Sequence, residues 1–194
     1  KLFIEYTAAN SIFTFAMAMA WPLFPLAQKY VLSMSIADLA ILNLLSSTST
    51  MLSQYALAKR VNKHDLLKLT LVGRAGLVMF PVVYALSSSP LPIYLWQAAS
   101  GPFTALGNVV IPLYVMEVAD PELKASYLSY YNLAQGIAAS LGSAVGGVVT
   151  DRIVAATGWN GVRYGLALSA LLRTLTLIPL ARMMSKKSRE TKGV

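Results

Sequence analysis

Long apolar stretches alternate with short polar or charged segments along most of the chain. Each stretch approaches the roughly 20 helical residues that cross a bilayer core, and charge, Gly or Pro bounds it. Outer-membrane strands would alternate apolar and polar residues at every second position, and these stretches do not. We therefore expect an all-α integral membrane protein with six spans. The expected spans are residues 6–26, 36–58, 66–86, 91–116, 126–150 and 162–183.

Composition favours the bilayer over water as the solvent for this chain. Of its 194 residues 56% are hydrophobic and 12% are charged, and the mean hydropathy is +0.59. A chain of this length buries only about 70% of its surface on folding, too little to hide such stretches from water. The chain has no Cys, which excludes a disulfide framework and a thiol nucleophile. No metal-ligand cluster, phosphate loop or catalytic set stands out, so we expect neither an enzyme nor a cofactor.

The net charge of +8 comes from residues that lie mostly between the apolar stretches. No basic face alternates with stacking aromatic residues, so nucleic acid is not an expected partner. Eleven of the sixteen Lys and Arg residues fall on one side of the six spans and three fall on the other. Because cytoplasmic loops retain positive charge, we expect both termini in the cytoplasm and the chain in the plasma or inner membrane. Residues 184–194 would then form a basic cytoplasmic tail.

Similar residues recur in the same order in the first three spans and in the last three. Because three spans is an odd number, the second copy would be inverted across the membrane. We therefore expect a six-helix bundle built as a 3+3 inverted repeat. The matched positions are Pro22 with Pro112, Asn43 with Asn132, Arg74 with Arg173 and Pro81 with Pro179.

Polar residues inside the apolar stretches concentrate in the first, second, fourth and fifth spans. In the fourth span, Gln97, Thr104 and Asn108 recur at helical spacing and share one face. Such residues cost free energy in hydrocarbon unless they face a cavity or a partner. Two explanations stay open, a substrate path and hydrogen bonds between helices. The residues expected to line the path are Asn10, Thr14, Asn43, Gln97, Asn108, Tyr131, Asn132 and Gln135.

Two arginines lie inside the spans, whereas the acidic residues lie near span ends. For Arg74 and Arg173 we expect structural pairing, or an interfacial route for the charged group, rather than contact with a substrate. Glu5 is the only candidate for a buried carboxylate that could couple proton movement to another process.

Four short stretches carry recognisable patterns. Residues 57–64 form a basic loop, and residues 117–125 contain an acidic residue, an Asp-Pro pair and a Lys in that order. Residues 136–147 are rich in Gly, and residues 169–173 lie in the last span, before the basic tail. Together these stretches resemble the C-terminal half of a major facilitator superfamily transporter. Lys59 stands where the family's loop motif has Asp, and Ser143 stands where its glycine-rich pattern has Pro.

This resemblance implies one half of a permease that transports a small solute by alternating access. Its partners would be the lipid bilayer, the small-molecule solute and either an N-terminal six-helix half or a second copy of the chain. The resemblance also implies that Glu117 bridges to Arg60 or Lys63 at the cytoplasmic end and that Lys124 joins these gating residues. A non-transporting membrane scaffold or assembly subunit stays open as the alternative.

Overall fold

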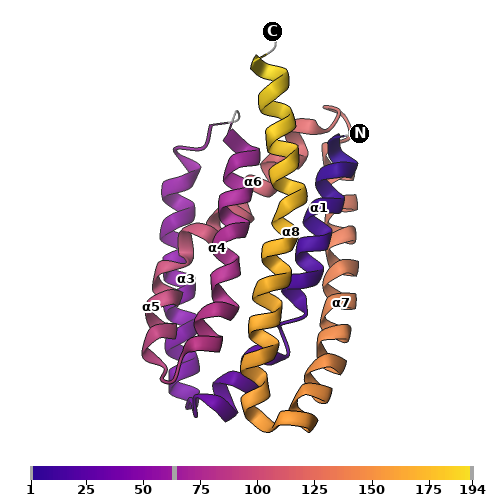
Figure 1. Ribbon diagram of the computed structural model, residues 1–194. Helices are drawn as coiled ribbons and strands as arrows, with labels where there is room; N and C mark the ends of the chain where they lie inside the picture. The colour runs from indigo at the N-terminus through magenta and orange to yellow at the C-terminus, as the bar shows by residue number, and fades with distance from the viewer. Residues whose placement is uncertain (1, 63–64, 193–194) are drawn as a thin grey trace.

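The computed structural model describes residues 2–62 and 65–192 as a bundle of long helices (Figure 1). None of these residues forms a strand, which confirms the expected all-α class. The count of membrane-length stretches is five rather than the expected six, because the last stretch runs through two long helices and the short helical turn that joins them. The five stretches are Leu2–Val31, Ile36–Ala58, Leu66–Leu86, Leu91–Val118 and Lys124–Ser185.

Two of these stretches are interrupted helices. The first contains α1 (Leu2–Ala18), α2 (Leu23–Leu26) and the π-helical turn η1 (Ala27–Val31), and the fourth contains α5 (Leu91–Ala99) and α6 (Gly101–Val118). Proline removes a backbone donor from a helix, which explains both positions: Pro22 lies between α1 and α2, and Pro102 is the second residue of α6. The expected spans 6–26 and 91–116 lie within these two stretches, and neither is one continuous α-helix.

The helices α3 (Ile36–Ala58) and α4 (Leu66–Leu86) begin and end where the predicted spans do. Local chemistry explains the sharp start of α3. The Ser35 side chain accepts a hydrogen bond from the Asp38 backbone N–H, and the Asp38 carboxylate accepts one from the Ser35 backbone N–H. This reciprocal capping box satisfies two backbone donors that an uncapped helix would leave without partners.

The last two helices, α7 (Lys124–Thr157) and α8 (Gly161–Lys192), are longer than the predicted spans 126–150 and 162–183. A one-turn 3-10 helix, η3 (Gly158–Asn160), joins them. Gly158 has φ 66° and ψ −163°, a conformation that residues with a Cβ atom essentially do not adopt. The chain therefore reverses at this residue, and α8 continues through most of the residues that were expected to form the tail.

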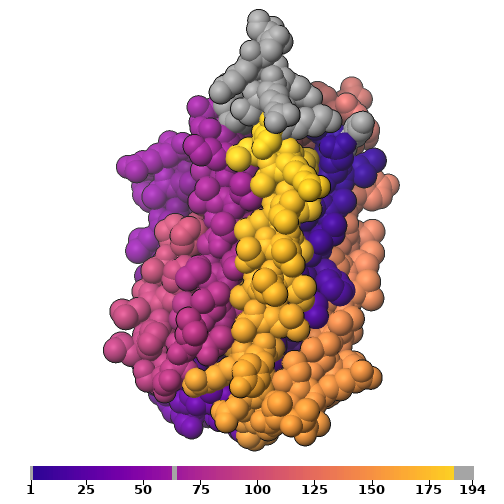
Figure 2. All heavy atoms as spheres, viewed as in Figure 1, coloured from indigo at the N-terminus to yellow at the C-terminus, as the bar shows by residue number. Residues whose placement is uncertain are grey.

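The long helices pack as an open crescent in the order α7, α1, α8, α4, α6 and α3. Figure 2 shows α8 between α4 on one side and α1 and α7 on the other. Within the described ranges, α3 and α7 share no extensive contact, so the two ends of the crescent are not joined along their length. The side opposite α4 and α8 is consequently the open side of the bundle.

Glycines bring two pairs of helices into close contact. A Cβ atom at Gly142 of α7 would collide with the Phe15 carbonyl of α1, and one at Gly101 of α6 would collide with the backbone of Ser49 of α3. Small residues permit this approach because no side chain separates the two backbones. Gly136, by contrast, faces open space.

Candidate functional site

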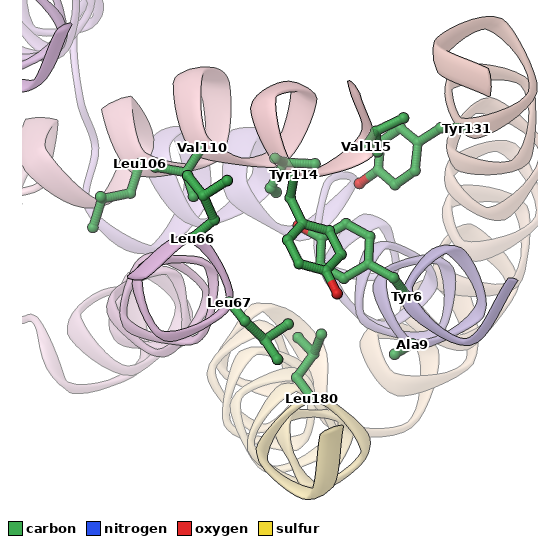
Figure 3. Packing of buried hydrophobic residues seen from close by; sticks show 11 residues of the cluster. Tyr6, Ala9, Leu66, Leu67, Leu106, Val110, Tyr114, Val115, Tyr131 and Leu180 are labelled. Carbon is green, nitrogen blue, oxygen red and sulfur yellow. The ribbon is translucent and has the colours of Figure 1, made fainter. Parts of the chain in front are cut away.

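The end of the bundle where α1 begins and α8 ends is densely packed. The Tyr6 ring lies against Tyr114, with ring centroids 4.2 Å apart, and its centroid is 6.3 Å from that of Tyr131. Figure 3 shows the rings of Tyr6 and Tyr114 facing each other, with Leu180 of α8 in the same cluster. The Tyr6 hydroxyl lies 3.0 Å from the Thr70 hydroxyl of α4. Aromatic rings from α1, α6 and α7 therefore close this end of the crescent, which we call the packed end.

Arg74 lies buried among neutral partners near the packed end, with only 7% of its surface exposed. Its Nε donates to the Asn10 side-chain oxygen at 3.1 Å, and its guanidinium lies 4.7 Å from the centre of the Phe13 ring. The Tyr131 hydroxyl also interacts with the guanidinium. Arg74 thus has the structural pairing that the sequence analysis expected, through an amide, a phenol and an aromatic ring.

Gln135 joins α7 to α1 near the middle of the bundle. Its side-chain oxygen accepts from the Thr14 hydroxyl at 2.6 Å, and its side-chain nitrogen donates to the Ser11 hydroxyl at 2.9 Å. Four predicted path residues, Asn10, Thr14, Tyr131 and Gln135, are therefore brought together on α1 and α7. Their bonds connect helices, which favours the interhelical explanation for these four.

The opposite half of the bundle, which we call the hollow end, contains a cavity of about 380 Å³. Helices α1, α3, α4, α5, α6 and α8 all contribute to its wall. The wall is mainly aromatic and apolar with a few polar groups, which is typical of small-molecule sites. The lining residues are Met17, Trp21, Phe24, Gln28, Ser46, Leu77, Phe80, Tyr84, Gln97, Thr104 and Arg173.

Arg173 reaches the cavity wall from the middle of α8 and is 2% exposed. Its Nη1 donates to the Leu77 carbonyl and its Nη2 to the Met17 carbonyl, both at 2.9 Å. Its Nε has no hydrogen-bond partner. The expected structural pairing is thus present, through two backbone carbonyls and the Phe24 ring, whose centre lies 5.9 Å from the guanidinium. No acidic side chain among the described residues pairs with this positive charge, which stays at the wall of the cavity.

Gln97 is the one member of the eight predicted path residues that lines this cavity in the described part of the chain. Its side-chain oxygen is buried and has no hydrogen-bond partner. Asn43 of α3, Asn108 of α6 and Asn132 of α7 are exposed instead. The structure therefore does not bring these three residues together with Gln97, and their role in a path stays a prediction.

The aromatic lining of the cavity was not predicted from the sequence, and Arg173 was not predicted to line a substrate path. Trp21, Phe24 and Phe80 look like any other apolar residue in a membrane span, so no sequence signal distinguishes cavity-facing rings from lipid-facing ones. Arg173 did carry a signal, because its span contains no acidic residue that could pair with it.

Three of the four predicted gating residues lie at the packed end. Arg60 follows α3, Glu117 lies one residue before the end of α6 and Lys124 begins α7, and all three are exposed. Lys63 lies outside the described residues. The bridge from Glu117 to Arg60 or Lys63 therefore stays a prediction.

Comparison with known proteins identifies one family. A family model described as Major Facilitator Superfamily matches residues 7–193, which is nearly the whole chain. Comparison with curated proteins and with solved structures finds no match. The membrane-length helices agree with this family, whose members are multi-pass transporters rather than enzymes. The chain belongs to the Major Facilitator Superfamily, as the sequence resemblance predicted.

Proposed function

We propose that this chain is one six-helix half of a permease that moves a small solute by alternating access. The observation that supports this proposal most directly is the contrast between the two ends of the crescent. The rings of Tyr6 and Tyr114 close one end, while the other end contains a cavity of about 380 Å³. A transporter that is open to one side of the membrane at a time needs such a closed end and such a hollow end.

The packing of the helices supports a 3+3 inverted repeat. In this arrangement α1 to α4 form one copy and α5 to α8 form the other, with α1 corresponding to α6, α3 to α7 and α4 to α8. Helix α1 packs mainly against α7 and α8, and α6 packs mainly against α3 and α4. Under the correspondence above, the neighbours α7 and α8 of α1 become the neighbours α3 and α4 of α6. A repeat requires this equivalence.

A partner half would cover the open side of the crescent. Among the residues of α3 only Leu42 is buried, while polar side chains such as Asn43, Ser47 and Thr48 are exposed. Exposed polar groups cost free energy in hydrocarbon, so a partner or a water-filled path must face them. We propose that an N-terminal six-helix half, or a second copy of this chain, packs there. The distribution of Lys and Arg supports cytoplasmic termini and a plasma or inner membrane location.

Single-cysteine accessibility tests the hollow path. Because the chain has no Cys, each variant carries one reactive thiol. In membranes, we expect a water-soluble thiol reagent to label Gln97→Cys and Thr104→Cys at the hollow end but not Asn10→Cys at the packed end. Leu168→Cys is the matched control: its side chain is exposed on α8, where lipid excludes the reagent. Protection of the Gln97 and Thr104 variants equal to that of Leu168→Cys would contradict the path and favour the scaffold alternative.

A further inference from the structure

Arg173 is a buried cation whose bonds in the described part of the chain go only to neutral groups. Its acceptors are the backbone carbonyls of Met17 and Leu77, each at 2.9 Å. A guanidinium has five N–H donors, and the Nε–H of Arg173 has no acceptor. A buried charge costs free energy unless an opposite charge compensates it. The wall of the cavity that Arg173 lines therefore favours an anion.

The corresponding arginine of the other repeat copy shows that burial alone does not create this condition. Arg74 is almost as buried as Arg173, but Asn10, Phe13 and Tyr131 surround its guanidinium. Arg74 also does not line the cavity. Neither arginine has an opposite charge among the partners given for it, but only Arg173 lines a cavity in which a ligand could supply one.

The rest of the cavity defines what kind of anion fits. Its volume of about 380 Å³ is in the range of sites for small organic molecules. The aromatic rings of Trp21, Phe24 and Phe80 can contact the apolar part of an organic anion. A hydrated inorganic anion has no such apolar part. The unpartnered side-chain oxygen of Gln97 can accept a hydrogen bond from a ligand hydroxyl or amine. Among the described residues Arg173 is the single charged group in the lining, so it matches a single negative charge.

We propose that the cavity binds a small organic carboxylate with one negative charge, whose carboxylate lies against Arg173 and whose apolar body lies against the aromatic wall. This proposal rests on the proposed function, because it names the substrate class of the same path. Carboxylate and guanidinium form charge-assisted hydrogen bonds, which are about twice as strong as those between neutral groups.

Fluorescence of Trp21 can report binding directly. Replacing Trp96 and Trp159 by Phe leaves Trp21, which lines the cavity, as the one Trp in the chain. The chain in lipid nanodiscs is titrated with benzoate, benzamide and benzylamine, which share a ring and differ in charge. We expect benzoate to change Trp21 emission at concentrations at least about tenfold lower than the other two, a difference of about 1.4 kcal/mol in binding free energy.

Two variants locate the binding. Arg173→Gln should remove the preference for benzoate, so that all three compounds act in the same concentration range. Arg74→Gln is the matched control, a buried arginine away from the cavity, and should keep the preference. If Arg173→Gln fails to fold, Ser46→Phe provides the second variant, because it fills the cavity from α3 without changing Arg173 and should abolish the benzoate effect.

Equal responses to the three compounds, a preference for benzylamine, or benzoate binding that survives in Ser46→Phe would overturn the proposal. These are equilibrium measurements that need no transport, so they separate the two proposals. If the chain prefers benzoate but its Gln97→Cys variant is not labelled, the anion site is supported and the transport path is contradicted. If Gln97→Cys is labelled but the chain shows no preference for benzoate, the transport path is supported and organic carboxylates are excluded as the substrate class.

Discussion

The packed end and the hollow end each contain one buried arginine, and the two arginines have different surroundings. Side chains of Asn10 and Tyr131 and the ring of Phe13 contact Arg74. Two backbone carbonyls and, at 5.9 Å, the ring of Phe24 contact Arg173, and one of its nitrogens has no hydrogen-bond partner. Burial therefore does not separate a structural arginine from one that can meet a ligand. The separating feature is that Arg173 lines the cavity and Arg74 does not.

The two ends also differ in the continuity of their helices. Both interruptions lie at the hollow end, where α1 gives way to α2 and where α5 gives way to α6 at Ser100. Pro102 leaves the carbonyl of Ala98 without its helical donor, and the Ser49 hydroxyl of α3 donates to that carbonyl. Interrupted helices in transporters occur where the backbone lines a cavity. The packed end consists of uninterrupted helices, so its side chains can interdigitate fully.

The largest expected effect is the difference between removing an aromatic ring at each end. Tyr6→Ala removes a ring that is 0% exposed and one of the two hydrogen bonds of the Thr70 hydroxyl, which keeps its bond to the Leu66 carbonyl. We expect it to lower the free energy of unfolding by about 3–5 kcal/mol. Phe80→Ala, in the wall of the cavity, should lower it by less than half as much, because that ring already borders empty space. Denaturant titration in detergent, followed by Trp fluorescence, measures both, and equal losses would contradict the distinction between the ends.

The next effect concerns the two arginines. Arg74→Met removes the donor to the Asn10 side-chain oxygen, and we expect it to lower the free energy of unfolding by about 1–3 kcal/mol. Arg173→Met removes two bonds to backbone carbonyls and the contact with the Phe24 ring, but it leaves no polar side chain without its partner and it removes a buried charge. Replacing buried charges by apolar residues is often neutral or stabilising, so we expect a smaller loss. The same titration compares them, and a greater loss for Arg173→Met would mean that the protein already compensates its charge.

Particular residues show how much of the fold could be predicted. The bounds of α3 and α4 followed from where apolar stretches stop, and the Ser35 cap strengthens one of these signals. The break at Ser100 did not follow, because proline also occurs inside continuous membrane helices: Pro81 lies within α4. The count of six also differs from the five stretches found, because the helical turn Gly158–Asn160 joins α7 and α8 without a non-helical residue between them.

The candidate site was less predictable, because helix rotation decides where a polar side chain points. Asn10 and Asn43 look alike in sequence, yet Asn10 is buried against Arg74 and Asn43 is exposed. Gln97 was predicted for the path and does line the cavity. The lining by Trp21 could not be predicted, because an aromatic residue is equally compatible with lipid, a neighbouring helix or a cavity.

The smallest expected effect separates two polar residues of α7 that lie three positions apart. Gln135→Leu removes the bonds to Thr14 and Ser11, and interhelical hydrogen bonds in membranes contribute about 0.6 kcal/mol each on average. We therefore expect it to lower the free energy of unfolding by about 1 kcal/mol. Asn132→Leu is the matched control, since Asn132 is exposed, and it should change that free energy by less than about 0.5 kcal/mol. If the two losses are equal, the bonds of Gln135 do not join α1 to α7, and Gln135 returns to the residues that are free to face a solute.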